Sequence, residues 1–268
     1  MNAEKSREIL ETALKTGGSI LMDHFGNSSE AVVKESISSV VTEADLASEK
    51  VIIENLMTTP EPFNIITEES GYIHNGSAYT WVVDPLDGTS NFAAGLPWFG
   101  IIITLFHNEL PIQAAMYLPM EEQLYFAETG KGAFINGKSI KCNLSNDLTE
   151  ILVAYSFDFS SDPGKTDAEM NILNKFSKKI RNTRSTNSLI DFCYTADGRL
   201  GAAINQTTKI WDIAAPWLII REAGGVVTDI SGADIRFNLS RETVNQNYTI
   251  VAAGSAIHGQ LINIINQH

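Results

Sequence analysis

The sequence has few cysteines, few basic residues relative to acidic ones and no long apolar run. Each of these shortages argues against a class of protein. Cys142 and Cys193 are the only cysteines in 268 residues, so neither a disulfide framework nor a cysteine zinc site is expected. Nineteen Lys and Arg against 32 Asp and Glu give a formal net charge of -13, which disfavours binding to nucleic acid and to anionic membranes. No apolar run approaches the roughly 20 residues that a membrane-spanning helix needs.

Some familiar motifs are missing as well. The sequence has no Gly-x-x-x-x-Gly-Lys loop and no kinase catalytic loop, which argues against a nucleotide-binding kinase. It also has no internal repeat, low-complexity segment or obvious flexible linker. The N-terminal residues are polar and then amphipathic, so no signal peptide is predicted and a cytoplasmic enzyme is the default expectation.

Hydrophobic periodicity predicts an α+β protein in which strands cluster early and alternate with helices later. Helices are expected over residues 9–21, 45–57, 167–179, 189–196, 212–222 and 257–265, and strands over 63–67, 79–83, 99–106, 110–117, 123–127, 133–135, 151–157 and 248–253. Asp212 would cap its helix, with Pro216 in the first turn, where no intrahelical bond is lost. The pattern favours a layered sandwich in one domain over residues 1–268, with subdomains of roughly 1–145 and 146–268.

Asp84-Pro85-Leu86-Asp87-Gly88-Thr89 is the most informative stretch of the sequence. It follows an aromatic and β-branched run typical of a short buried strand, so Asp84 is expected where that strand ends. Gly88 would let a phosphoryl group approach the backbone closely, and Thr89 would bring a hydroxyl to the start of a helix whose free N–H groups attract anions. Asp84 and Asp87 at one turn repel each other unless a cation holds them. The stretch therefore predicts metal-assisted phosphate chemistry.

The spacing of these two aspartates also favours one mechanism over another. Haloacid-dehalogenase-like phosphatases need Asp-x-Asp, with nucleophile and acid two positions apart, whereas here the spacing is three. The spacing argues against a covalent aspartyl-phosphate and favours direct attack by a metal-bound water.

Three further acidic sites are placed to join this turn. Glu68-Glu69 follows a predicted strand, where one carboxylate would point to the strand's end, although adjacent glutamates are most often a solvated pair. Asp45 and Asp212 each either join the site or serve only as helix N-caps. No single acid is decisive, and only the combination indicates a common site.

Three segments of the chain resemble the signature regions of the inositol monophosphatase family, which shares its fold with fructose-1,6-bisphosphatases and 3'-nucleotide phosphatases. These segments are residues 68–70, 81–92 and 211–215, and further similarity at 41–45, 130–137 and 223–229 extends the resemblance over nearly the whole chain. The resemblance implies a layered αβαβα sandwich and a Mg²⁺-dependent phosphoric monoester hydrolase that acts on a small sugar or inositol phosphate. It also implies lithium sensitivity and a homodimer.

The resemblance implies a role for each matching position. Glu68, Asp84 and the main-chain carbonyl of Leu86 would hold a first Mg²⁺, and Asp84 would bridge to a second. Asp87 and Asp212 would complete the second, and Glu68 would help a third, weaker one; oxygen ligands of this kind suit Mg²⁺.

The catalytic and substrate-binding roles are also carried over from the family. Glu68, Asp45 and Thr89 would orient and help to deprotonate the attacking water, which the metals acidify. The N–H groups of Gly88 and Thr89 would hold the phosphate. The substrate-binding set implied by the family is Asp87, Gly88, Thr89, Asn205 and Asp212.

Substrate choice is where the sequence departs from the family. Inositol-specific members typically carry a glutamate seven residues before the Trp-Asp aspartate, and here that position is Asn205. The loop at 184–189 is also altered: Arg184 either contacts a second phosphate or lies on the surface. Lys34 either stabilises the anionic site or is simply solvated. Adenosine 3',5'-bisphosphate and fructose 1,6-bisphosphate thus remain alternative substrates, and a catalytically silent regulator is a rival from another class.

Overall fold

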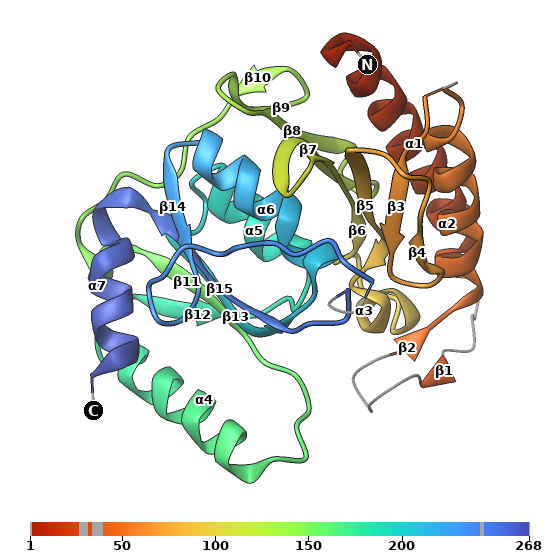
Figure 1. Ribbon diagram of the computed structural model, residues 1–268. Coiled ribbons are helices and arrows are strands. Elements are labelled where there is room, and N and C mark those ends of the chain that lie inside the picture. The colour runs from red at the N-terminus through yellow and green to blue at the C-terminus, as the bar shows by residue number, and fades with distance from the viewer. Residues whose placement is uncertain (1, 27–31, 34–39, 60, 242–243, 268) are drawn as a thin grey trace.

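Two β-sheets lie within layers of helices in this computed structural model, which describes residues 2–26, 32–33, 40–59, 61–241 and 244–267 (Figure 1). The large sheet has eight strands in the order β10-β9-β8-β7-β6-β5-β3-β4. Its strands are β3 (Asn64–Thr67), β4 (Gly71–Ile73), β5 (Tyr79–Asp87), β6 (Gly100–His107), β7 (Leu110–Leu118), β8 (Gln123–Glu128), β9 (Gly132–Ile135) and β10 (Lys138–Ser139). Only the β3–β5 pair is parallel, and the other pairs in this sheet are antiparallel.

The small sheet has five strands in the order β12-β11-β13-β15-β14, and a further two-stranded pair joins β1 (Val32–Val33) to β2 (Val40–Val41). The five strands are β11 (Leu152–Ser156), β12 (Asn182–Arg184), β13 (Ala202–Thr208), β14 (Gly225–Thr228) and β15 (Tyr248–Gly254). Strands β12, β11 and β13 run parallel, so their carboxyl ends meet at one edge. Ligand sites in α/β sheets favour that edge.

The helices form three layers around the two sheets. They are α1 (Ala3–His24), α2 (Glu43–Leu56), the short α3 (Thr89–Ala93), α4 (Pro163–Phe176), α5 (Leu189–Ala196), α6 (Ile210–Glu222) and α7 (Ser255–Asn266), with a 3₁₀ turn at Leu148–Glu150. Helices α1 and α2 cover the outer face of the large sheet, α5 and α6 fill the space between the sheets, and α4 and α7 cover the small sheet (Figure 1). The layered αβαβα sandwich expected from the sequence is confirmed.

Alternation along β5 explains how one strand can serve two cores. Trp81 and Val83 pack toward α1 and α2, whereas Val82 packs toward α6 in the middle layer. Because helices cover both faces of the sheet here, the side chains on both faces of the strand are mostly apolar, and polar and apolar residues do not alternate along it.

The division into subdomains at residues 1–145 and 146–268 stays a prediction. In the part of the chain that the structure describes, no helix is both long and apolar enough to span a bilayer.

Several element boundaries differ from the expectation, each for a local reason. Helix α4 begins at Pro163 rather than near 167, because the Asp162 side chain caps Gly164 N–H and proline suits the first helical position. Strand β5 continues through Asp87 with an irregularity after Asp84, so the expectation that the strand ends at Asp84 is wrong.

Helix α6 begins two residues before the expected start at Asp212. Asp212 is therefore not the N-cap residue: it lies in the first turn, and its Oδ2 accepts the Lys209 N–H at 2.6 Å. Pro216 consequently falls in the second turn, and the expectation that it costs no helix bond is wrong. Proline has no backbone N–H, so Pro216 cannot donate the helical hydrogen bond that the Asp212 carbonyl would otherwise accept.

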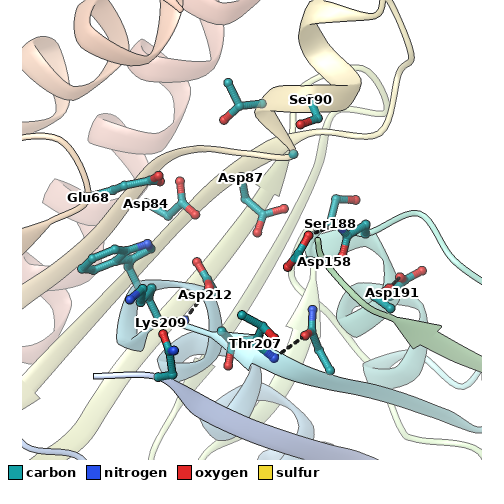
Figure 2. A pocket seen from close by; sticks show the side chains of 18 of the residues that line it. Glu68, Asp84, Asp87, Ser90, Asp158, Ser188, Asp191, Thr207, Lys209 and Asp212 are labelled. Atoms are coloured by element: carbon teal, nitrogen blue, oxygen red, sulfur yellow. Dashed lines mark hydrogen bonds between the residues drawn. The ribbon is translucent and has the colours of Figure 1, made fainter. Parts of the chain in front are cut away.

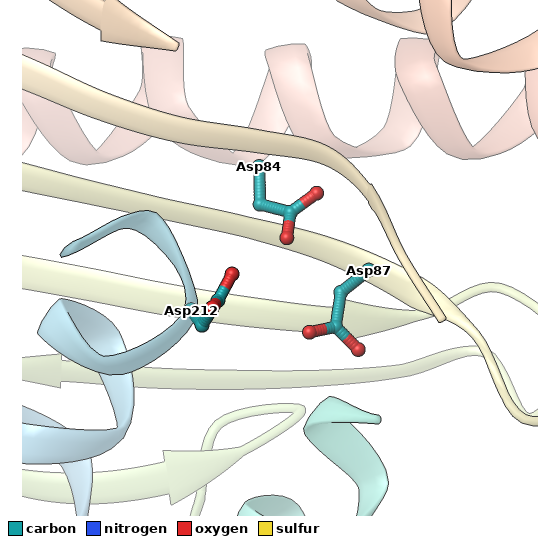
Figure 3. A group of neighbouring side chains, drawn as sticks. All are labelled: Asp84, Asp87 and Asp212. Carbon is teal, nitrogen blue, oxygen red and sulfur yellow. The ribbon is translucent and has the colours of Figure 1, made fainter. Parts of the chain in front are cut away.

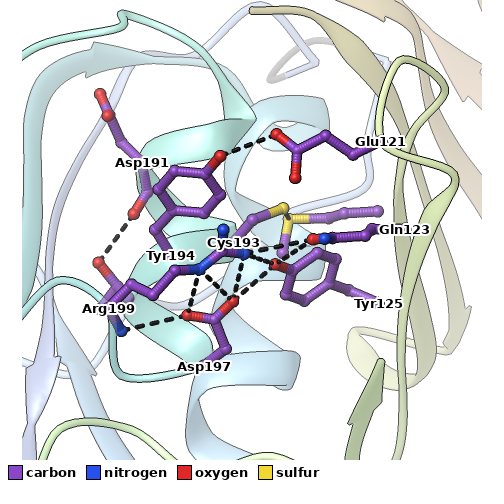
Figure 4. A network of polar contacts seen from close by, with 10 residues as sticks. Glu121, Gln123, Tyr125, Asp191, Cys193, Tyr194, Asp197 and Arg199 are labelled. Atoms are coloured by element: carbon purple, nitrogen blue, oxygen red, sulfur yellow. Dashed lines mark hydrogen bonds and ion pairs between the residues drawn. The ribbon is translucent and has the colours of Figure 1, made fainter. Parts of the chain in front are cut away.

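A polar network attaches the C-terminal end of α5 to strand β8 (Figure 4). Asp197 accepts hydrogen bonds from Arg199 Nη2 at 2.6 Å, from Arg199 Nε at 2.9 and 3.1 Å, and from the Tyr125 hydroxyl at 2.7 Å. The Arg199 guanidinium also lies over the Tyr194 ring, 3.5 Å from its centroid. Asp197 is thus a nearly buried carboxylate whose acceptors are all used within the chain.

Candidate active site

A polar cavity of about 690 Å³ opens where the two sheets and the middle helices meet (Figure 2). One side is formed by the β5–α3 turn of the large sheet. The other is formed by the carboxyl ends of β11 and β13 with the first turns of α5 and α6. The cavity therefore combines the Asp84–Thr89 stretch with residues from Ser156 onward, which lie 67 or more positions later in the sequence.

Asp84, Asp87 and Asp212 form a compact group of carboxylates at this cavity (Figure 3). Each offers one oxygen, and these oxygens all lie within 4.8 Å of one another. The irregularity of β5 between Asp84 and Asp87 directs both side chains toward α6, whose first turn carries Asp212. The fold thus brings the Asp84–Thr89 turn and the distant Trp211-Asp212 motif together, as the sequence predicted.

Burial and mutual repulsion act on all three groups. Burial, then the charges of Glu68, Asp87 and Asp212, raise the pKa of Asp84 well above its ordinary value. Burial likewise raises the pKa of Asp212 well above the ordinary value, and that of Asp87 to about 7. Hydrogen bonds from the Leu86 N–H to Asp84 at 3.0 Å and from the Leu189 N–H to Asp87 at 2.5 Å oppose the rise only in part. A bound cation would offset this repulsion.

The donor chemistry of the group fits a hard divalent cation. Three carboxylates within reach of one point, all oxygen donors, match the ligands that Mg²⁺ takes in proteins. Glu68 lines the same cavity and its charge raises the pKa of each of the three aspartates. Its carboxylate lies beside the three-aspartate group rather than within it. Leu86 also lines the cavity.

Asp45 and Thr89 form a hydrogen-bonded pair between α2 and α3. The Thr89 hydroxyl lies 3.0 Å from Asp45 Oδ1 and 2.9 Å from the Leu86 carbonyl oxygen, either of which can accept its proton. The other carboxylate oxygen of Asp45 accepts the N–H and the hydroxyl of Thr42 at 2.7 and 2.6 Å. Asp45 is therefore not the N-cap of α2: it lies in the first turn, its carboxylate accepts the N–H of the N-cap residue Thr42, and it reaches the site through Thr89.

Gly88 is required by packing as well as by any phosphate. Its φ of 85° lies in the left-handed region, and a Cβ there would come within 2.5 Å of the Trp98 carbonyl oxygen and 3.2 Å of the Ser188 Cβ. The sequence motif suggested only close approach of a ligand. The structure adds that the β5–α3 turn is pressed against the neighbouring backbone, which fixes the position of Thr89.

The cavity is lined by Asn205 but not by Arg184. Asn205 pairs with Ser156 across the parallel strands β11 and β13, and its Oδ1 accepts the Thr207 N–H at 2.8 Å. Both Asn205 and Ser156 line the cavity. Arg184 is exposed on β12, and its guanidinium donates to the Thr183 carbonyl at 2.7 Å. Of the two roles that the sequence left open for Arg184, the structure therefore shows the surface position. Lys34 lies outside the described residues.

Several lining residues were not anticipated. Asp158 and Asp191 add two more carboxylates, and Lys165 and Lys209 add two ammonium groups. Asp191 is nearly buried and accepts the Thr186 N–H at 3.2 Å and the Ser156 hydroxyl at 3.1 Å. Asp158 could have been found by the logic applied to Glu68, because it too follows directly on a predicted strand.

Comparisons with known proteins agree with this geometry. A family model described as the inositol monophosphatase family matches residues 2–268. A fructose-1,6-bisphosphatase/inositol-1-monophosphatase of Aquifex aeolicus is 30% identical, with 100% of this chain and 97% of that protein covered. A putative Nus factor SuhB of Neisseria meningitidis serogroup B is 34% identical, with 97% and 98% covered. The crystal structure of extragenic suppressor protein suhB from Bartonella henselae aligns with a TM-score of 0.87 at 28% identity, covering 97% of this chain and 98% of that one.

A layered sandwich that gathers three carboxylates at a polar cavity is the arrangement expected of a metal-dependent phosphatase. Within that class, the chain belongs to the inositol monophosphatase family. The family expected from the three sequence motifs is therefore confirmed.

Proposed function

We propose that the protein is a Mg²⁺-dependent phosphomonoesterase that hydrolyses a small sugar or inositol phosphate by direct attack of water. The observation that carries the proposal is the group formed by Asp84, Asp87 and Asp212, whose oxygens lie within 4.8 Å of one another. Three carboxylates this close, one of them buried and two half-buried, are unfavourable unless they hold a cation, and a cation held there faces a cavity large enough for a sugar phosphate.

The metal-binding residues in this proposal are Asp84, Asp87 and Asp212, with Glu68 and the main-chain carbonyl of Leu86. Bound Mg²⁺, two or three ions per site, would neutralise phosphate charge and lower the pKa of water. The three aspartates are expected to be ionised when the cation is bound, despite the raised pKa that each has alone.

The chain's own groups supply the proton path and the phosphate cradle. The Thr89 hydroxyl can pass its proton to Asp45 Oδ1, 3.0 Å away, while its oxygen accepts a proton from the attacking water. Asp45 is fixed for this task because Thr42 holds its other oxygen. The N–H groups of Gly88 and Thr89 would bind phosphate oxygens at the start of α3.

The alcohol part of the substrate would lie against Asn205 and Ser156. Both side chains are uncharged and can hydrogen-bond to sugar hydroxyls. Arg184, which the sequence offered either as a contact for a second phosphate or as a surface residue, is exposed on β12 and does not line the cavity, whereas Lys165 and Lys209 do. We take a monophosphate as the substrate and keep fructose 1,6-bisphosphate and adenosine 3',5'-bisphosphate as alternatives.

Phosphate release from inositol 1-phosphate, fructose 1,6-bisphosphate and adenosine 3',5'-bisphosphate, with Mg²⁺ and with chelator, tests the proposal. We expect metal-dependent release that is fastest from the inositol ester. Failure to release phosphate from any of these, or from other small phosphomonoesters, would refute it and favour the silent regulator. The Nus factor named among the relatives makes such a regulator the second candidate, although this chain retains every predicted metal ligand.

Three further properties stay predictions within this proposal. Lithium should inhibit the reaction, the enzyme should be cytoplasmic, and two copies should associate. Exposed Leu96, Trp98, Phe157 and Phe159 near the cavity give a second copy apolar surface to cover. Light scattering of the purified protein would give the oligomeric state.

A further inference from the structure

Helix α2 presents three buried polar side chains to three different segments of the site. Asp45, Ser48 and Glu49 lie at helical spacings of three and four, so they share one face. Asp45 contacts Thr89, and the Ser48 hydroxyl donates to the Pro85 carbonyl at 2.8 Å. No sequence motif assigned a role to Ser48 or Glu49.

Glu49 binds the turn that carries Glu68. Its Oε2 accepts the Thr67 hydroxyl at 2.7 Å, the Glu69 N–H at 3.0 Å and the Ser70 N–H at 3.3 Å. Its Oε1 accepts the Ser70 hydroxyl. These four donors belong to residues on both sides of Glu68, so one carboxylate fixes the backbone before and after it.

The cost of burying Glu49 indicates that this contact is specific. Glu49 is 3% exposed, and a buried carboxylate is unfavourable unless hydrogen bonds compensate for its lost hydration. Packing of α2 on the sheet would be served as well by an apolar side chain. The hydrogen bonds of Glu49 instead hold the β3–β4 turn, which is the element that directs Glu68 into the cavity.

We propose that Glu49 is a positioning residue that sets the affinity of the site for its divalent cation by fixing the direction of Glu68. The inference rests on the proposed function, because it takes Glu68 as a metal ligand. Groups that orient metal ligands typically contribute about 10- to 100-fold in metal affinity. Glu49 itself lies behind the turn and touches neither metal nor substrate in this assignment.

The test is calorimetric titration of Mn²⁺ alone into the metal-free full-length protein and its variants. Glu49→Ala removes all four acceptor contacts and should weaken Mn²⁺ binding by about 10-fold or more. Glu49→Gln should restore most of the affinity, because its amide oxygen can still accept from Thr67, Glu69 and Ser70 while its NH₂ donates to the Ser70 hydroxyl.

Asp197→Asn is the matched control, because Asp197 is also a nearly buried carboxylate that accepts several hydrogen bonds, but outside the cavity. It should lower the melting temperature without changing Mn²⁺ affinity. Ser70→Ala is an exposed substitution that removes one donor to Glu49, and it should weaken Mn²⁺ binding even if Glu49→Ala does not fold.

The outcomes separate this inference from the proposed function. Unchanged Mn²⁺ affinity in folded Glu49→Ala, or in Ser70→Ala where Glu49→Ala fails to fold, would overturn the positioning role alone. Equal weakening by Asp197→Asn would also overturn it, since the effect would then follow general stability. A wild-type protein that binds no divalent cation would overturn both.

Discussion

The Asp84, Asp87 and Asp212 group and the Asp197 network place the same chemical group, a carboxylate, in opposite surroundings. Asp197 receives the guanidinium of Arg199 and the hydroxyl of Tyr125, so its charge is balanced within the chain (Figure 4). The three aspartates face one another, and among the described residues no lysine or arginine forms an ion pair with them. Burial raises the pKa of each of the three as a consequence.

The difference shows how a buried acid can indicate either stability or function. A carboxylate whose partners are all in the chain contributes to folding, and breaking it leaves donors unpaired. A group of carboxylates that has backbone donors but no cationic partner in the chain is unfavourable in the metal-free protein and becomes favourable when a cation binds. The two regions should therefore respond oppositely to neutral substitutions.

Asp87→Asn should have the largest effect on activity. Loss of about 3 kcal/mol of transition-state stabilisation would lower turnover about 100-fold or more, because the substitution removes a metal ligand. The metal-free fold should be unharmed, since the asparagine oxygen can still accept the Leu189 N–H. Turnover at saturating Mg²⁺ and the melting temperature in chelator measure the two effects. Near-normal turnover would show that the metal assignment is wrong.

Thr89→Ala should come next, with turnover lowered about 100-fold by loss of proton transfer through the hydroxyl. Thr89→Ser keeps the hydroxyl that contacts Asp45 at 3.0 Å and serves as the matched control. Steady-state kinetics of both variants at saturating Mg²⁺ provide the comparison. If alanine and serine lowered turnover equally, the hydroxyl would have no part in the proton path.

The stability of the metal-free protein should fall as pH rises from about 4 to about 7. The folded-state pKa of Asp87 is raised from 3.8 to about 7, so in this window the native state binds more protons than the unfolded state. Stability from this group is therefore fully present below pH 3.8 and is lost as pH rises through about 7. Melting curves in chelator should show the decline, and saturating Mg²⁺ should remove it. A decline that persisted unchanged in Asp87→Asn would have another source.

Asp197→Asn should have the smallest effect and the opposite signature. We expect a loss of about 1–2 kcal/mol in unfolding free energy, because hydrogen bonds to charged groups are weakened and Arg199 is partly exposed. Phosphatase activity at a temperature where the variant is folded should not change. Urea unfolding and phosphate release on the same preparation check both statements, and a loss of activity without loss of stability would contradict the comparison.

The sequence predicted the chemistry of the site more completely than the path of the chain around it. The Asp84–Thr89 stretch and the Trp-Asp motif carry their meaning in short spacings, so Asp84, Asp87 and Asp212 could be named before any fold was known. Continuous apolar runs such as 99–106 likewise predicted central strands to within a residue or two. These features depend on neighbours in sequence.

Features that depend on distant partners were missed. Strand β13 ends in Asn205, Gln206, Thr207 and Thr208, a polar run whose strand pairing comes from distant segments: Asn205 pairs with both β11 and β15, and Thr208 pairs with β15. Glu49 is one of several polar residues on α2, and nothing in its sequence neighbours indicates that it accepts hydrogen bonds from the β3–β4 turn. Asp191 is similar, since its donors come from Ser156 and Thr186 on other segments.

The most direct test of the account is to titrate Mg²⁺ into the metal-free protein at pH 7 while measuring phosphate release from inositol 1-phosphate in parallel samples. We expect cation binding and hydrolysis to rise together, and chelator to abolish both. Hydrolysis that continues undiminished in chelator, or Mg²⁺ binding that leaves hydrolysis unchanged, would contradict the claim that Asp84, Asp87 and Asp212 form the catalytic metal site.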